Sequence, residues 1–285
     1  MTEPTSPMPL QAHEVTIGYH GRDIVNRLSI GIERGRFTAL LGPNGCGKST
    51  LLRALAGLLA PKSGTISLEG QPIAQLSRKQ LAIRLSFLPQ IPRAPDDITV
   101  RDLVEQGRYP HRRPLAPWSA ADRAACIEAL ELTHMVARAE QPLATLSGGQ
   151  RQRAWLAMTL AQSADILLLD EPTTYLDMAH QLELLALLRR LVDERGKTIL
   201  AVLHDINQAG QFADKLALLS EGSIAGLGCP VDVITAETIR TVFHVDGMVL
   251  ANPMAPCPLF LPRTALACID TADDATRSLV PAPER

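Results

Sequence analysis

The stretch LLGPNGCGKSTLL, residues 40–52, decides the fold of this chain. It places three glycines, a lysine and two hydroxyl side chains between two apolar runs. Within it, GPNGCGKS at residues 42–49 satisfies the pattern G-x-x-x-x-G-K-[ST]. Glycines let the backbone wrap closely, so that successive N–H groups point inward at an anion. The pattern therefore predicts a phosphate-binding loop.

The flanking residues favour a strand before this loop and a helix after it. RFTALLG, residues 36–42, is typical of a buried strand, and KSTLLRALAGLLA, residues 48–60, has leucines at helical spacing. A helix N-terminus adds positive potential, Lys48 would reach the β- and γ-phosphates of a nucleotide, and Ser49 would ligate Mg²⁺. The residues expected to bind the nucleotide here are Gly42, Pro43, Asn44, Gly45, Cys46, Gly47, Lys48, Ser49 and Thr50.

Two later apolar runs, DILLLDEP and KTILAVLH, predict strands of a parallel sheet that is covered on both faces. The first ends in Asp170 and Glu171, at the edge where ligands bind in this architecture. Asp170 would then hold Mg²⁺ and Glu171 would deprotonate the attacking water, whereas without a phosphate loop both would be interpreted as solvated acids. Alternating strands and helices indicate an α/β fold.

Composition narrows the class of protein. The chain has 285 residues and a formal net charge of −2, which does not favour nucleic-acid binding. No apolar run reaches the roughly 18 residues that span a bilayer, and we see no export signal. The five cysteines lack metal-ligand spacing, so a reduced cytosolic setting is the simplest interpretation.

Residues 89–146 differ in texture, with many prolines and short helices, and predict an inserted helical subdomain. Ser119 and Asp122 have capping-box spacing at the start of one helix. A basic cluster in this region has three interpretations: a solvated loop, a contact with a permease or lipid headgroups, or, least favoured, nucleic acid. The cluster consists of Arg108, His111, Arg112 and Arg113.

The stretch LSGGQRQR, residues 146–153, is uncommonly specific. Together with the phosphate loop and LLLDEP, it makes the chain resemble the nucleotide-binding subunits of ATP-binding cassette (ABC) transporters over about residues 10–263. The resemblance implies a P-loop NTPase with a RecA-like parallel sheet, an N-terminal antiparallel β subdomain and a helical subdomain inserted at about 90–160. Residues 264–285 are expected to form a disordered tail.

The resemblance also implies roles for further residues. Tyr19 would stack on adenine, Gln90 would contact Mg²⁺ and signal to the membrane subunit, and His204 would touch the γ-phosphate. Taken alone, each has an ordinary structural interpretation, such as a surface tyrosine or a core histidine. In the resemblance, the helix that begins in LSGGQ would contact the partner's ATP through Ser147, Gly148, Gly149 and Gln150. Asp177 would lie in the loop that links the two ATP sites of the dimer.

Within the family, GRYPH, PTTYLDMAHQLELL and VLHDINQA resemble importers of ferric siderophores such as enterobactin. Cobalamin, haem or another metal chelate is the alternative cargo, and a non-transport cassette protein is a less favoured class. The implied cofactors are ATP and Mg²⁺. The implied partners are a second copy in a head-to-tail dimer, permease subunits at the cytoplasmic face of the inner membrane and, indirectly, a substrate-binding protein, but no nucleic acid.

Overall fold

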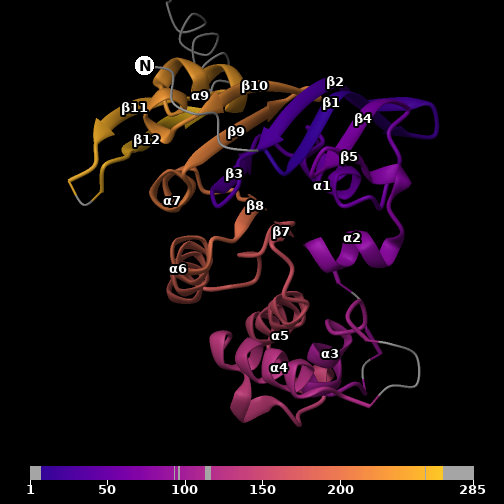
Figure 1. Ribbon diagram of the computed structural model, residues 1–285. Coiled ribbons are helices and arrows are strands. Elements are labelled where there is room, and N and C mark those ends of the chain that lie inside the picture. Colours follow the sequence, from indigo (N-terminus) through magenta and orange to yellow (C-terminus); the bar gives the residue numbers. More distant parts are fainter. Residues whose placement is uncertain (1–7, 93, 96, 113–116, 254, 266–285) are drawn as a thin grey trace, which may run out of the picture.

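The computed structural model describes residues 8–265 except 93, 96, 113–116 and 254 (Figure 1). Its centre is a sheet with the strand order β10-β9-β3-β8-β7-β6, in which β10 alone among these described strands runs antiparallel to its neighbour. The expectation of a parallel α/β core is confirmed. The strands are β3 (Phe37–Leu41), β6 (Leu85–Leu88), β7 (Ile166–Leu169), β8 (Thr198–Val202), β9 (Lys215–Ser220) and β10 (Ser223–Gly228).

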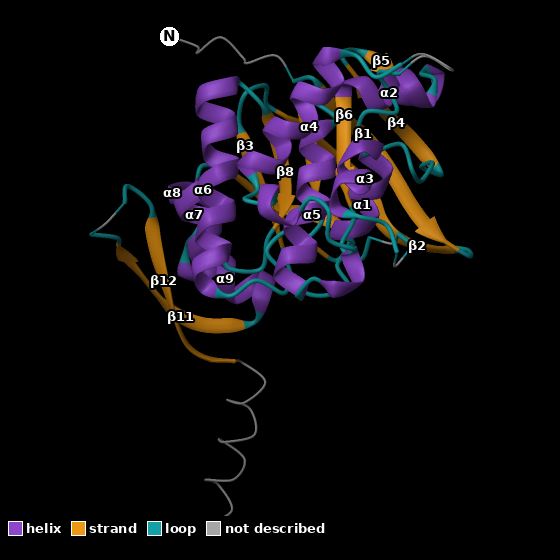
Figure 2. Cartoon of the chain, turned by 90° about the horizontal axis from the view of Figure 1, so that it is seen from below, coloured by secondary structure: helices purple, strands orange, loops and turns teal. Residues whose placement is uncertain are grey.

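Both faces of this sheet are covered, which is why its strands lack polar alternation. On β3, Phe37, Ala39 and Leu41 belong to one buried cluster and Leu40 to the other. Helices α6 (Met178–Arg195) and α7 (Ile206–Phe212) cover the first face. Figure 2, seen from below, shows helices such as α5 and α6 in front of the central strands β3 and β8.

A second sheet of antiparallel strands covers the other face through helix α1 (Lys48–Leu55). The sequence suggested a longer helix, to residue 60, but the chain leaves the helix at Gly57, whose φ of 69° is left-handed. The N-terminal antiparallel subdomain is therefore present. Its strands are β1 (Leu10–Tyr19), β2 (Arg22–Ile32), β4 (Ser63–Leu68) and β5 (Gln71–Pro72).

Three helices pack on one another at one end of the molecule, away from the antiparallel sheet (Figure 1). Capping boxes begin each of them, at Thr99, Ser119 and Ser147, and the box at Ser119 with Asp122 is the one that the sequence predicts. We call α3 (Val100–Gln106), α4 (Ala120–Leu132) and α5 (Gly148–Ala161) the helical subdomain. The 3₁₀ turn Val136–Arg138 packs on α4, and a further 3₁₀ turn is Leu143–Thr145, whereas the turn Ile73–Gln75 packs on β4 and helix α2 (Arg78–Arg84) packs on β6.

The basic cluster is not a solvated loop. Arg108 is buried: its Nε lies 2.9 Å from Asp122 Oδ1 and its Nη1 donates to Ala161 O. His111 Nε2 lies 2.7 Å from Gln162 O, and Arg112 stacks over the ring of Trp118. Arg113 lies outside the described residues. The cluster therefore ties the three helices of the subdomain together.

The C-terminal part adds α8 (Pro230–Val233), α9 (Ala236–Phe243) and a hairpin of β11 (Val245–Ala251) and β12 (Pro258–Ala265). Because β12 continues to Ala265, the first two residues of the expected tail are strand, and 266–285 lie outside the described residues. Among the described helices, none is long and apolar enough to cross a membrane.

Candidate active site

The carboxyl ends of four parallel strands bring the motif residues to one edge of the sheet. The phosphate loop follows β3, His204 follows β8, and Asp170 and Glu171 follow β7. Strand β8 lies between β3 and β7, so His204 lies between the loop and the two acids. Gln90 follows β6, the next strand outward. Residues that are far apart in sequence therefore meet because of strand order.

Two glycines of the phosphate loop cannot be replaced without moving the backbone. A Cβ on Gly42 would lie 2.1 Å from Leu219 O. Gly47, with φ of 107°, forms the N-cap of α1 and packs on Ile24 and Val25 of β2. The backbone therefore follows the close wrap that phosphate binding requires, with a helix N-terminus at its end.

Lys48 is buried at the centre of the loop and folds back over it. Its Nζ donates to Gly42 O at 2.8 Å and Pro43 O at 2.9 Å. Cys46 Sγ lies 4.0 Å from the same nitrogen, and no ion pair of the described residues gives this ammonium group a carboxylate partner. The loop therefore presents a positive charge where phosphate oxygens would bind.

The side chains of Ser49 and Asp170 lie together and offer oxygen ligands suited to a divalent cation. Ser49 Oγ donates to Asp170 Oδ1 at 2.9 Å. Asp170 has no exposed surface, and its Oδ2 accepts no hydrogen bond within the described chain. Burial raises the pKa of Asp170, against the lowering effect of the hydrogen bond from Ser49. Hydroxyl and carboxylate oxygens are the ligands that Mg²⁺ prefers.

Glu171 is held in place by three side chains. Its Oε2 lies 2.9 Å from His204 Nε2 and accepts a hydrogen bond from Thr174 Oγ1 at 3.2 Å, and Gln90 bonds it as well. Burial raises the pKa of Glu171. The hydrogen bond and charge of His204, together with hydrogen bonds from Gln90 and Thr174, outweigh burial and bring the pKa of Glu171 below its usual value. The carboxylate is therefore ionised at neutral pH. Its backbone is left-handed, with φ of 52°.

The LSGGQ residues lie at the exposed start of α5. Ser147 Oγ accepts from Gln150 N at 3.3 Å, and Gln150 Oε1 accepts from Ser147 N at 3.1 Å. Gly148 and Gly149 pack against Tyr175 and Leu176. No hydrogen bond of the described residues joins this helix start to the phosphate loop of the same chain. Gly148 lines a groove of about 320 Å³ that also includes Gln90 and Trp155.

Tyr19 and Asp177 lie at the margins of the site. Tyr19 ends β1 and is 37% exposed, and β2 beside it contacts the phosphate loop at Gly47. Asp177 caps α6 by accepting from His180 N at 2.9 Å, and this bond with the His180 ring lowers the pKa of Asp177. Neither residue touches Lys48 or Glu171 through a hydrogen bond of the described chain.

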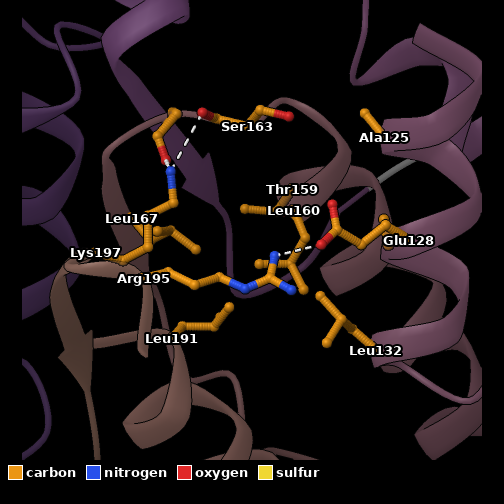
Figure 3. A pocket seen from close by; sticks show the side chains of 12 residues that line it. Ala125, Glu128, Leu132, Thr159, Leu160, Ser163, Leu167, Leu191, Arg195 and Lys197 are labelled. Atoms are coloured by element: carbon orange, nitrogen blue, oxygen red, sulfur yellow. Dashed lines mark hydrogen bonds and ion pairs between the residues drawn. The ribbon is translucent and has the colours of Figure 1, made fainter. Parts of the chain in front are cut away.

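Sequence reasoning missed Thr174, which bonds Glu171, and Gln181, whose contacts are described below. Thr174 stands in the PTT that follows Glu171, so its proximity could have been suspected, whereas Gln181 has no signal in a single sequence. A separate cavity of about 320 Å³ lies between α4 and α6, where Glu128 Oε1 and Arg195 Nη1 pair at 2.6 Å (Figure 3). It lies apart from the strand ends that form the site.

The strand order, the phosphate loop and the paired acids define a P-loop nucleotide-binding protein with a carboxylate suited to hydrolysis. Comparison with known proteins narrows this class. A family model described as "ABC transporter" matches residues 25–174, more than half of the chain. The chain belongs to the ABC transporter family, as its relatives also show.

The relatives are ATP-binding subunits of importers. The ferric enterobactin transport ATP-binding protein FepC of Escherichia coli (strain K12) is 46% identical, with 93% of this chain and 98% of FepC covered. The iron(3+)-hydroxamate import ATP-binding protein FhuC of Bacillus subtilis (strain 168) is 44% identical, covering 88% and 94%. The hemin import ATP-binding protein HmuV of Bordetella pertussis (strain Tohama I) is 43% identical, covering 87% and 97%.

Two solved structures share the fold. An ABC transporter described as metal-chelate type, in an inward-facing conformation, superposes with a TM-score of 0.77 at 28% identity, covering 90% of this chain and 98% of that chain. The dimeric bacterial ABC transporter cassette MJ0796 superposes with a TM-score of 0.70 at 27% identity, covering 77% and 98%. The expected family and fold are confirmed.

Proposed function

We propose that this chain is the ATP-hydrolysing subunit of an importer that carries an iron(III)–siderophore complex across the inner membrane, from its cytoplasmic face. The observation that carries the hydrolytic role is the meeting of Lys48, Asp170 and Glu171 at one edge of the sheet. The cargo class rests on likeness to FepC and FhuC, which serve ferric siderophores.

ATP would bind with its phosphates in the loop, and Lys48 would exchange the carbonyls of Gly42 and Pro43 for phosphate oxygens. Mg²⁺, held by Ser49 and Asp170 with Gln90 nearby, would neutralise phosphate charge. Catalysis of this kind consists mainly of positioning and charge stabilisation. Tyr19 would stack on the adenine from the end of β1.

Glu171 would orient the attacking water and take its proton. Because the surroundings lower the pKa of Glu171, the carboxylate is a weak base, and its main work is to polarise and aim the water. His204 Nε2 already faces Glu171 at 2.9 Å, so it is placed to contact both this carboxylate and the γ-phosphate. Product ADP and phosphate would then leave.

Two copies would assemble head to tail. Ser147 and Gly148 are exposed at a helix N-terminus, which favours anions, and this end makes no hydrogen bond with its own chain's loop. A partner's ATP would occupy it, with Gly149, Gln150 and Asp177 close by. The dimeric cassette MJ0796 supports the formation of a dimer. The closing and opening of the dimer would be transmitted through Gln90 and the helical subdomain to permease subunits. A substrate-binding protein would deliver the cargo to these permease subunits.

The test is transport with the chain's own membrane partner. We would isolate that partner from native membranes by pull-down, reconstitute both with the substrate-binding protein in proteoliposomes, and measure uptake of a ferric catecholate, a ferric hydroxamate, haem and cobalamin. We expect ATP-driven uptake of a ferric siderophore, abolished in Lys48→Ala, which should also lose ATP binding by calorimetry.

Each other outcome counts against the proposal. Uptake of haem alone, to which HmuV points, or of cobalamin alone would replace the siderophore as cargo. A pull-down that recovers no membrane protein would favour a non-transport cassette protein. Unchanged ATP binding by Lys48→Ala would overturn the assignment of the phosphate loop.

A further inference from the structure

The loop that carries both Glu171 and Asp177 is held from outside by side-chain amides. Gln181, in the first turns of α6, donates its Nε2 to Leu176 O at 3.1 Å and approaches Thr173 O at 3.4 Å. The loop's own turn bonds are long, at 3.2 Å from Thr174 N to Glu171 O and 3.3 Å from Leu176 N to Thr173 O. External support therefore matters for its shape.

Gln181 is itself held by α7, the helix that follows His204. Gln208 of α7 donates its Nε2 to Gln181 Oε1 at 3.1 Å. Helix α7 begins two residues after His204, and Asp205 Oδ1 caps it by accepting from Gln208 N at 3.0 Å. We call Gln208 and Gln181 the amide relay, because they connect the His204 segment to the Glu171 loop.

The far end of the relay is fixed as well. Asn207, next to Gln208, donates to Phe260 O at 3.0 Å and accepts from Phe260 N at 2.8 Å. Phe260 is a buried residue of β12. Both side-chain hydrogen-bonding groups of Asn207 are therefore used to anchor α7 on the C-terminal hairpin, so the relay starts from a rigid support.

The relay works in one direction only. Backbone carbonyls can only accept, so the NH₂ group of Gln181 must face the loop and its oxygen must face Gln208. Gln208 must then present its own NH₂ group. A carboxylate at Gln208 would put two oxygens together, or would turn the oxygen of Gln181 onto the loop carbonyls.

We propose that Gln181 and Gln208 are positioning residues for ATP hydrolysis, which set the place of the Glu171 loop relative to His204. The proposal rests on the hydrolytic function above. The contact that it maintains is the 2.9 Å approach of His204 Nε2 to Glu171 Oε2. Displacement of a catalytic group by about 1 Å can lower a rate about 10²-fold. The phosphate loop is not part of the relay, so ATP affinity should not depend on it.

The test uses the full chain with its membrane partner and compares Gln208→Glu with Gln208→Lys. Glutamate has nearly the shape of glutamine but cannot donate when ionised, whereas lysine differs in shape but donates. We expect Gln208→Glu to lower kcat about 10-fold or more with KM for ATP within about twofold. Gln208→Lys should recover most of that rate. Gln181→Glu should behave like Gln208→Glu.

The matched control is Gln211→Glu, the same change at an exposed position of α7. It should keep the wild-type rate. A Gln208→Glu protein as active as this control would overturn the relay. So would a lysine variant that is worse than the glutamate variant, with rates that follow the thermal unfolding midpoint, because packing alone would then explain the effect. An inactive wild-type protein would instead contradict the proposed function.

Discussion

At the scale of single residues, Asp170 and Glu171 are neighbours with opposite electrostatic surroundings. Burial dominates at Asp170 and raises its pKa, whereas the contacts of His204, Gln90 and Thr174 outweigh burial at Glu171 and lower its pKa. Asp170 is thus suited to binding a cation, and Glu171 stays ionised at neutral pH. Two adjacent acids can divide the work in this way because Asp170 is fully buried beside Ser49, whereas Glu171, with its left-handed backbone, faces His204 and Thr174.

Glu171→Gln should separate binding from hydrolysis. The change removes the negative charge but preserves the size of the side chain, so we expect turnover to fall about 10²–10³-fold while MgATP binding persists. The protein should accumulate as a closed dimer, seen by size-exclusion chromatography with MgATP. Glu183→Gln, at an exposed position of α6, is the control. A wild-type rate in Glu171→Gln would remove this residue from the role of base.

The motif residues could be recognised in the sequence because each lies next to a strand or helix signal. Lys48 follows the glycines that come after an apolar strand. Glu171 and His204 each come shortly after the end of an apolar strand. Gln181 and Gln208 could not be found in this way. Their role comes from a side-chain contact between two helices, and a glutamine on a helix surface is otherwise ordinary.

At the scale of elements, a buried ion pair joins helices of the helical subdomain. Arg108 joins the end of α3 to Asp122 of α4 and to Ala161 of α5, and it also donates to Ser163 Oγ at 2.9 Å. A basic run beside a proline suggested a surface loop or a partner contact. Burial of Arg108 could not be foreseen, because it depends on how three helices pack.

Arg108→Met should destabilise the protein by about 3 kcal/mol, because it removes the charged partner of buried Asp122, which keeps only its hydrogen bonds from Ser119. Denaturant unfolding of the purified chain measures this. Arg101→Met is the control: the ion pair of Arg101 with Glu140 is exposed, so its loss should cost about 1 kcal/mol or less. Equal losses in the two variants would contradict the importance of burial.

The same pair predicts a dependence on pH. Hydrogen bonds from Ser119 and Arg108 lower the pKa of Asp122. A lowered pKa contributes stability above the unfolded value of about 3.9, and this contribution is lost as the pH falls through the folded value. The stability difference between wild type and Arg108→Met should therefore narrow below about pH 4, measured by the unfolding midpoint at each pH.

At the scale of the whole molecule, the helical subdomain and the sheet core share one buried apolar cluster, with polar contacts at its margin. Gln162 Nε2 donates to Leu85 O at 2.9 Å on one side. On the other, the ion pair of Glu128 and Arg195 is about half exposed beside a cavity, so it adds little stability (Figure 3). We expect the subdomain to turn relative to the core when nucleotide binds.

Tryptophan fluorescence should report that turn. The chain has two tryptophans, and Trp155 lines the groove at the junction together with Gln90. In Trp118→Phe, we expect MgATP to change the emission of Trp155. Lys48→Ala in the same background should show no change. An emission spectrum that stays unchanged when MgATP is added would contradict coupling between the nucleotide site and the helical subdomain.

The sequence predicted the parallel sheet and its two covered faces because apolar runs without alternation are a local signal. It did not predict the strand order, which depends on long-range pairing, nor the C-terminal hairpin. That hairpin supports α7 through Asn207 and Phe260, two residues more than fifty positions apart. No local pattern marks such a pair.

The left-handed backbone at Glu171 has a consequence for protein engineering. A non-glycine residue in this region carries a strain of about 1–3 kcal/mol. Backbone energetics alone would therefore favour glycine at a position where the reaction requires a carboxylate. Directed evolution that rewards only heat resistance would tend to erase function here, and a library for a more durable transporter should leave codon 171 unchanged.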